Sequence, residues 1–168
     1  MKHHKEEERR RIPEDLKPGR RHPYRLNDES YRNVNLPITV TCTARRRFPV
    51  LVDSTAEIVA QTLMQASDRR DAKLIAYCVM PDHLHFLIHL DADDTPPQFL
   101  RYFKGEASRR INVAWRKPGA FRWQRSYWDT FAHDVEAMEE QIAYVLHNPV
   151  RWELCDRAED WPFSADLR

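Results

Sequence analysis

The sequence predicts an α+β fold, a ferredoxin-like sandwich with helices packed on one face of an antiparallel sheet. Runs rich in β-branched and aromatic residues alternate with stretches of helical spacing, in the order strand, helix, strand, strand, helix, strand, helix. The 168 residues are 42% hydrophobic and 32% charged, which is typical of one globular domain. No apolar run approaches the roughly 20 residues that a membrane span needs, so a cytoplasmic protein without a membrane partner is expected.

Residues 1–33 mix charged residues and proline with few apolar side chains, which predicts an N-terminal arm ahead of a domain at 34–168. The first strand is expected at 35–43, where β-branched residues are frequent. Ser54 and Glu57 have the spacing of a capping box, which predicts a helix over about 54–68.

A hairpin is predicted next, because two β-rich runs, Lys73 to Met80 and His83 to Leu90, flank Pro81 and Asp82. The pair Thr95-Pro96 is a start signal for a second helix, whose buried side chains are expected to be Phe99, Tyr102, Phe103 and Ile111.

The last elements are a short strand within Phe121–Phe131 and a third helix. Asp134 can cap this helix, which is expected to run to about His147 and to be stopped by Pro149.

Charge is distributed unevenly along the chain, although the formal net charge is only +1. Residues 126–168 have three basic and ten acidic residues. Residues 101–125 contain one acidic residue and eight basic ones: Arg101, Lys104, Arg109, Arg110, Arg116, Lys117, Arg122 and Arg125. This asymmetry predicts one surface for a polyanion and another for solvent, with ordinary solvated helix faces as the alternative.

His83 and His85 are two residues apart, so on a strand both point to one face, about 6 to 7 Å apart at the backbone. Two imidazoles in this position can share one metal ion. The side chains between and beyond them point the other way, into the core: Leu84, Phe86 and Ile88.

Tyr144 lies on the polar side of the third helix, together with Gln141 and Asn148. It projects nearly opposite the centre of the apolar stripe, which consists of Val135, Met138, Ile142, Val145 and Leu146. Such a tyrosine can attack phosphorus when a nearby cation stabilises the developing charge, and the alternative is an exposed tyrosine with no special role.

Five stretches of the chain resemble the REP-associated tyrosine transposases, which belong to the histidine-hydrophobic-histidine (HUH) single-tyrosine endonucleases. The similar stretches are Val34–Asp53, Tyr77–Leu90 (YCVMPDHLHFLIHL), Trp123–Asp129 (WQRSYWD), Ala143–Leu154 (AYVLHNPVRWEL) and Glu159–Ala165 (EDWPFSA). They occur in the order of the family, which makes the similarity specific.

The resemblance implies a metal-dependent endonuclease and strand transferase that acts on single-stranded hairpin (REP-like) DNA through a 5′-phosphotyrosine intermediate. By position, His83 and His85 match the ligands of a Mg²⁺ or Mn²⁺ ion, and Tyr144 matches the nucleophile. Asn148 matches the polar residue that completes the site, directly or through water, with Gln141 as the alternative. Monomer and dimer both stay open, with a monomer slightly favoured.

The expected contacts to the DNA backbone are Arg45, Arg46, Arg47, Lys104, Arg109, Arg110, Arg122 and Arg125. Aromatic residues for base stacking or for the core are Trp115, Trp123, Tyr127 and Trp128. The first alternative function is a domesticated hairpin-binding protein that does not cleave, and the second is a small structural metal protein. The presence of both histidines and the tyrosine favours the enzyme.

Overall fold

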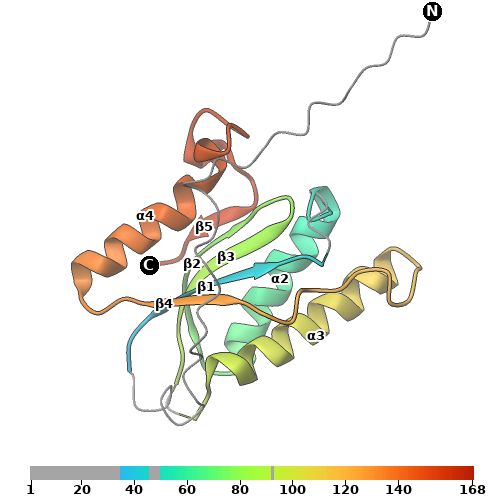
Figure 1. Ribbon diagram of the computed structural model, residues 1–168, viewed down its shortest axis with the longest axis horizontal. Coiled ribbons are helices and arrows are strands. Elements are labelled where there is room, and N and C mark those ends of the chain that lie inside the picture. Colours follow the sequence, from blue (N-terminus) through green and yellow to red (C-terminus); the bar gives the residue numbers. More distant parts are fainter. Residues whose placement is uncertain (1–34, 46–49, 92) are drawn as a thin grey trace, which may run out of the picture.

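The computed structural model describes residues 35–45, 50–91 and 93–168. The predicted arm, Arg46 and Arg47 lie outside the described residues. The sheet has five strands in the order β4-β1-β3-β2-β5, and every neighbouring pair is antiparallel (Figure 1). The strands are β1 (Ile38–Thr43), β2 (Lys73–Val79), β3 (His83–His89), β4 (Trp128–Phe131) and β5 (Ser164–Asp166).

The long helices of the described ranges are α2 (Asp53–Arg69), α3 (Pro96–Ala114) and α4 (Val135–Arg151), and a 3-10 helix spans Ala158–Asp160. The predicted α+β class and the order of its elements are confirmed, and β5 adds a strand to the edge of the sheet beside β2. Within the described part of the chain, no helix is both long and apolar enough to cross a membrane.

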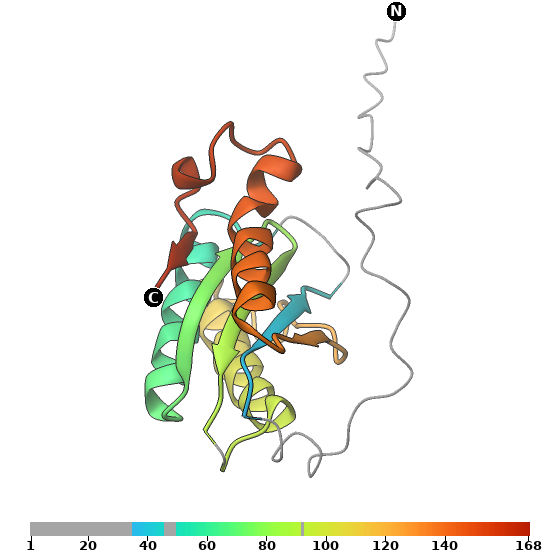
Figure 2. The same cartoon turned by 90° about the vertical axis from the view of Figure 1, so that its left-hand side faces the viewer.

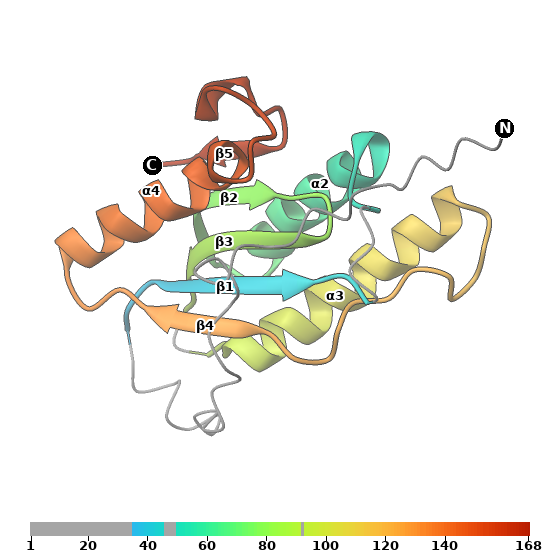
Figure 3. The same cartoon turned by 45° about the horizontal axis from the view of Figure 1, so that its top comes forward.

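The helices cover both faces of the sheet, so the expectation that they pack on one face is wrong for α4. Helices α2 and α3 pack on one face, here named the core face, and α4 crosses β2 and β3 on the other, named the site face (Figures 2 and 3). The reason is that the central strands also bear apolar side chains on the site face, including Ala76, Cys78 and Leu87. The apolar stripe of α4 covers them with Ile142 and Val145.

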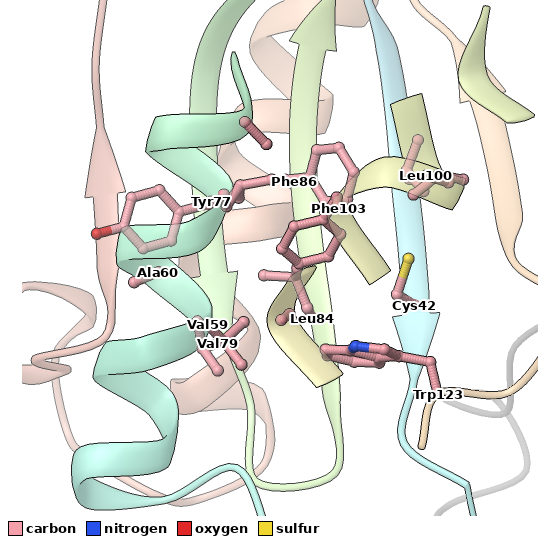
Figure 4. Packing of buried hydrophobic residues seen from close by; sticks show 14 of the residues in the cluster. Cys42, Val59, Ala60, Tyr77, Val79, Leu84, Phe86, Leu100, Phe103 and Trp123 are labelled. Carbon is pink, nitrogen blue, oxygen red and sulfur yellow. The ribbon is translucent and has the colours of Figure 1, made fainter. Parts of the chain in front are cut away.

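The core face is closed by aromatic packing between β3 and α3 (Figure 4). The ring of Phe86 lies 6.1 Å from that of Phe99 and 6.2 Å from that of Phe103, measured between centroids. Trp123 extends the cluster, with its ring 5.9 Å from that of Phe103. The four side chains are at most 7% exposed, so their burial stabilises the packing of α3 on the sheet.

Two predicted helix ends are wrong. The capping box at Ser54 does not form, and α2 begins one residue earlier without a side-chain cap, because the buried Leu51 fixes the entry of the chain by donating its N–H to the Pro81 carbonyl at 2.8 Å. Pro149 does not stop α4, which continues to Arg151. A proline in the last turn removes only its own N–H bond, and the Trp152 N–H still donates to the Asn148 carbonyl at 3.0 Å.

Candidate active site between strand β3 and helix α4

The two histidines of β3 lie side by side on the site face, as the strand alternation predicts. The ring centroids of His83 and His85 are 4.6 Å apart, with the planes at 88°. His83 is partly buried beside the connection to β2, whereas His85 lies under α4 with 5% of its surface exposed.

The Nδ1 atom of each imidazole lies within hydrogen-bonding distance of an oxygen from a neighbouring side chain. Asp82 Oδ1 lies 2.5 Å from Nδ1 of His83, and Thr41 Oγ1, from the paired strand β1, lies 2.8 Å from Nδ1 of His85. Partners of this kind fix the orientation of metal-binding imidazoles. The Nε2 atoms of both rings are therefore the atoms that can bind a common ligand.

His85 is held in its neutral form. Burial lowers its pKa well below the ordinary value of 6.5, and the neighbouring charges of His83 and Arg151 lower it further. A neutral imidazole is the form that binds a metal ion, so His85 can do so at neutral pH.

A polar row lies along α4: Gln141, Tyr144, Asn148 and Arg151 follow one another at spacings of three and four. The row lies beside the apolar stripe of the same helix, from which Val135 is missing because it is 71% exposed. The ring of Tyr144 lies 5.5 Å from the ring of His85, at 79°, and is 43% exposed. Tyr144 thus keeps contact with both the histidine pair and solvent.

Asn148 and Gln141 differ in which atoms of their side-chain amides already have a partner. Asn148 is 3% exposed, and its Nδ2 donates to the Tyr144 carbonyl at 2.6 Å, which leaves Oδ1 as the oxygen that could bind a cation. Gln141 uses both ends of its amide in packing, since Oε1 accepts from Thr39 at 2.5 Å and Nε2 donates to the Phe131 carbonyl at 3.1 Å.

The donor set suits a weakly held divalent ion. Among the described residues, no group of three His, Cys, Asp or Glu side chains could hold a metal. An ion at this site would therefore rest on the two imidazoles, an amide oxygen and water or substrate oxygens. This mixture of few protein ligands and open positions fits a catalytic ion better than a structural one.

The basic residues predicted for DNA binding separate into two groups in space. The α3 residues are on the core face, away from the histidines, and have partners within the protein. Lys104 donates to the carbonyls of Gln124 and Ser126 at 3.0 and 3.1 Å, while both Arg109 and Arg110 form ion pairs with Glu106 at 2.7 Å.

The second group, Arg45, Arg122 and Arg125, is exposed at the end of the sheet where β3 begins. The Arg45 N–H donates to the Arg122 carbonyl at 2.8 Å, and the neighbouring Ala44 N–H donates to the carbonyl of Asp82 at 2.8 Å. This group is therefore placed beside His83, whereas the α3 residues are not.

The predicted stacking residues are also divided. Trp115, Trp123 and Tyr127 pack against the hydrophobic cluster of the core face. Trp128 pairs with Thr41 across β1 and β4 and is partly exposed, so the strand register puts it on the site face. It is the member of the four that could meet a base near the histidines.

Four residues of the site were not predicted from the sequence: Asp82, Thr41, Arg151 and Trp152. Arg151 places its guanidinium carbon 5.1 Å from the Tyr144 ring centroid, and the ring of Trp152 lies 6.1 Å from that of His83. The adjacency of Asp82 to His83 and the two-turn spacing of Tyr144 and Arg151 were signals in the sequence. No signal pointed to Thr41, because strand pairing alone brings it to His85.

Sequence comparisons relate the chain to transposases. Residues 32–148 match the model of a protein family described as IS200-like transposases. A Haemophilus influenzae protein assigned as a REP-associated tyrosine transposase is 26% identical over 110 residues, which are 60% of this chain and 62% of that protein. The ISDra2 transposase TnpA of Deinococcus radiodurans is 26% identical over 118 residues, which are 70% of this chain and 77% of that protein. The chain thus spans less than two thirds of the Haemophilus influenzae relative.

Solved structures agree on the fold. A REP-associated tyrosine transposase bound to a REP hairpin superposes with a TM-score of 0.69 at 20% identity, over 84% of this chain and 80% of that one. A Deinococcus radiodurans protein assigned as a transposase superposes with a TM-score of 0.53 at 26% identity, over 79% of this chain and 97% of that one.

Proposed function

Because the chain belongs to the family of IS200-like transposases, we propose that it cleaves and rejoins single-stranded DNA beside hairpin (REP-like) sequences through a 5′-phosphotyrosine link to Tyr144. One observation carries the proposal: a tyrosine that is 43% exposed lies 5.5 Å from the ring of His85, one of two paired histidines that are each hydrogen-bonded through Nδ1. The relative solved with a REP hairpin supports hairpin DNA as the substrate class.

In the proposed reaction the Tyr144 hydroxyl oxygen forms a bond to phosphorus, and the bond from phosphorus to the 3′-oxygen breaks. The proton that the phenol loses passes to solvent, and the departing 3′-oxygen gains one. His83, His85 and the Asn148 Oδ1 would hold Mg²⁺ or Mn²⁺, which supplies Lewis-acid polarisation of the phosphate. The energy of the ester bond is kept in the phosphotyrosine, so the reverse step rejoins strands without ATP.

The protein's own contribution is orientation. Thr41 and Asp82 fix the imidazole planes, and α4 holds the tyrosine over them through the packing of Ile142 and Val145 on the strands. A nucleophile held in a fixed position has a higher effective concentration than one that diffuses freely in solution. The exposed edge of the Tyr144 ring leaves room for a strand of DNA to approach.

The test is a covalent adduct. Purified wild-type protein is incubated with end-labelled hairpin oligonucleotides that have single-stranded flanks, with Mn²⁺, and is run on a denaturing gel. We expect a protein–DNA band for the wild type and none for Tyr144→Phe, which keeps the ring against His85 and removes only the nucleophile. The melting temperature of this variant should stay close to that of the wild type.

Two controls separate the alternatives. Tyr77→Phe and Tyr127→Phe alter phenols that pack with the core-face cluster and should keep the adduct. An adduct with Tyr144→Phe would show that another residue is the nucleophile. Tight hairpin binding by the wild type without any adduct would instead identify a domesticated binding protein that no longer cleaves.

A further inference from the structure

We propose that Arg151 binds the phosphate that Tyr144 attacks, so that the C-terminal end of α4 is a phosphate-binding site. The sequence predicts DNA contacts in the basic segment 101–125 and at Arg45–Arg47, and Arg151 belongs to the acidic segment 126–168. The inference rests on the proposed function for the identity of the nucleophile, and it adds the group that would recognise the substrate beside it.

The position of Arg151 on α4 places its side chain beside Tyr144. Arg151 follows Tyr144 by seven residues, which at about 100° per residue returns its side chain to the same side of the helix. Side chains of a helix lean toward its N-terminus, so the long Arg151 side chain points back along the polar row. Its guanidinium carbon accordingly lies 5.1 Å from the centroid of the Tyr144 ring.

The charge of Arg151 also favours an anionic ligand. Arg151 is exposed and, among the residues that the structure describes, takes part in no salt bridge. The other two arginines of the acidic segment are paired: Arg157 with Glu159, and Arg168 with Glu139 and Asp166. Arg151 is thus a cationic side chain without an acidic partner in a segment that is otherwise rich in acidic residues. Such a side chain can bind an anionic ligand.

The chemistry of the guanidinium group suits a phosphate ligand. Stacking on an aromatic ring leaves the N–H donors at the edge of the guanidinium plane available, and these donors match two oxygens of one phosphate. The ring of Tyr144, on which the guanidinium lies, is itself 5.5 Å from the ring of His85, measured between centroids. One phosphate near the Tyr144 ring could therefore meet the arginine and the histidine pair together.

The affinity test uses binding without metal, so that it does not depend on cleavage. Fluorescence anisotropy measures the affinity of a labelled hairpin oligonucleotide with single-stranded flanks, in EDTA, across a salt series. Arg151→Ala should weaken binding on the order of 10-fold and lower the slope of log affinity against log salt by about 0.7. Arg151→Lys should keep the slope and lose part of the affinity, while Arg157→Ala, an exposed arginine with its own acid, should match the wild type.

The position of the contact is tested in the Tyr144→Phe background, where phenylalanine preserves the stacking surface. Each phosphate of the flank is replaced in turn by a neutral methylphosphonate. At one position Arg151→Ala should no longer weaken oligonucleotide binding further. In the active protein, cleavage should occur at this same phosphate.

The outcomes distinguish the two proposals. An adduct with the wild type, together with an unchanged salt slope for Arg151→Ala, would overturn the role of Arg151 and leave the proposed function intact. A reduced slope and a single methylphosphonate position, without any adduct, would support Arg151 and overturn cleavage. The proposed phosphate site is wrong if Arg151→Ala weakens binding by the same factor at every methylphosphonate position. It is also wrong if the wild type binds none of the oligonucleotides.

Discussion

The two faces of one sheet are built differently, and strand β3 belongs to both. Toward α2 and α3 it presents Leu84, Phe86 and Ile88, which are fully buried among other apolar side chains. Toward α4 it presents His83 and His85, which are separated from the other set only by the alternation of the strand. A change on one face therefore has little direct contact with the groups of the other.

The site face buries several polar side chains beside its apolar contacts, whereas the side chains that β3 turns to the core face are all apolar. Its buried polar groups must each find a partner, because an unpaired one loses about 1 to 3 kcal/mol. His85 has Thr41, Gln141 has Thr39 and Phe131, and Asn148 has the Tyr144 carbonyl. The comparison teaches that the core face supplies stability, while the site face uses part of it to hold polar groups in a fixed arrangement.

The largest expected effect comes from removing a histidine of the site face. His85→Ala should lower adduct formation by at least about 100-fold, because one imidazole cannot hold a divalent ion in a productive position. Adduct is followed over time with a titration of Mn²⁺. His89→Ala, at the far end of the same strand, is the control and should react at the wild-type rate. Normal cleavage by both His83→Ala and His85→Ala at limiting metal would refute the ligand pair.

Substitutions on the core face should instead lower the free energy of unfolding. Phe86→Ala removes a ring that packs between those of Phe99 and Phe103, and should reduce the free energy of unfolding by about 3 to 5 kcal/mol. Chemical denaturation measures this loss, which should exceed that of His85→Ala. The fraction that remains folded at low temperature should still form the adduct. A larger loss of stability from His85→Ala than from Phe86→Ala would remove the proposed division between the faces.

A smaller effect should come from the partner of His85. Thr41→Val keeps the shape of the side chain but removes the hydroxyl at 2.8 Å from Nδ1, so the imidazole loses a fixed orientation. The Mn²⁺ concentration for half-maximal adduct formation should rise roughly 10- to 100-fold. Thr41→Ser retains the hydroxyl and should stay near the wild type. Equal metal requirements for the valine and serine variants would show that the hydroxyl does not orient the ring.

The sequence by itself determined the features that depend on local periodicity. Alternation along a strand placed His83 and His85 on one face and Leu84, Phe86 and Ile88 on the other, and all five positions are confirmed. Helical spacing identified the apolar stripe of α4 apart from Val135. It placed Tyr144 nearly opposite the centre of that stripe, whereas the structure places Tyr144 beside it, 43% exposed and 5.5 Å from the ring of His85. The resemblance added the family, which residue spacing alone does not identify. The match of residues 32–148 to the IS200-like transposases confirms this family.

Only the tertiary structure decided which groups meet, because strand register and layer order join residues that are far apart in the chain. Register brings Thr41 to His85, and the packing of α4 on the second face of the sheet brings Tyr144 to the same histidine. Charge counted along the sequence pointed to α3, where Arg109 and Arg110 pair with Glu106 on the opposite face of the sheet. The exposed arginine at the tyrosine, Arg151, comes instead from the segment with the largest excess of acidic residues, since electrostatics depends on distances in space and not on order in the chain.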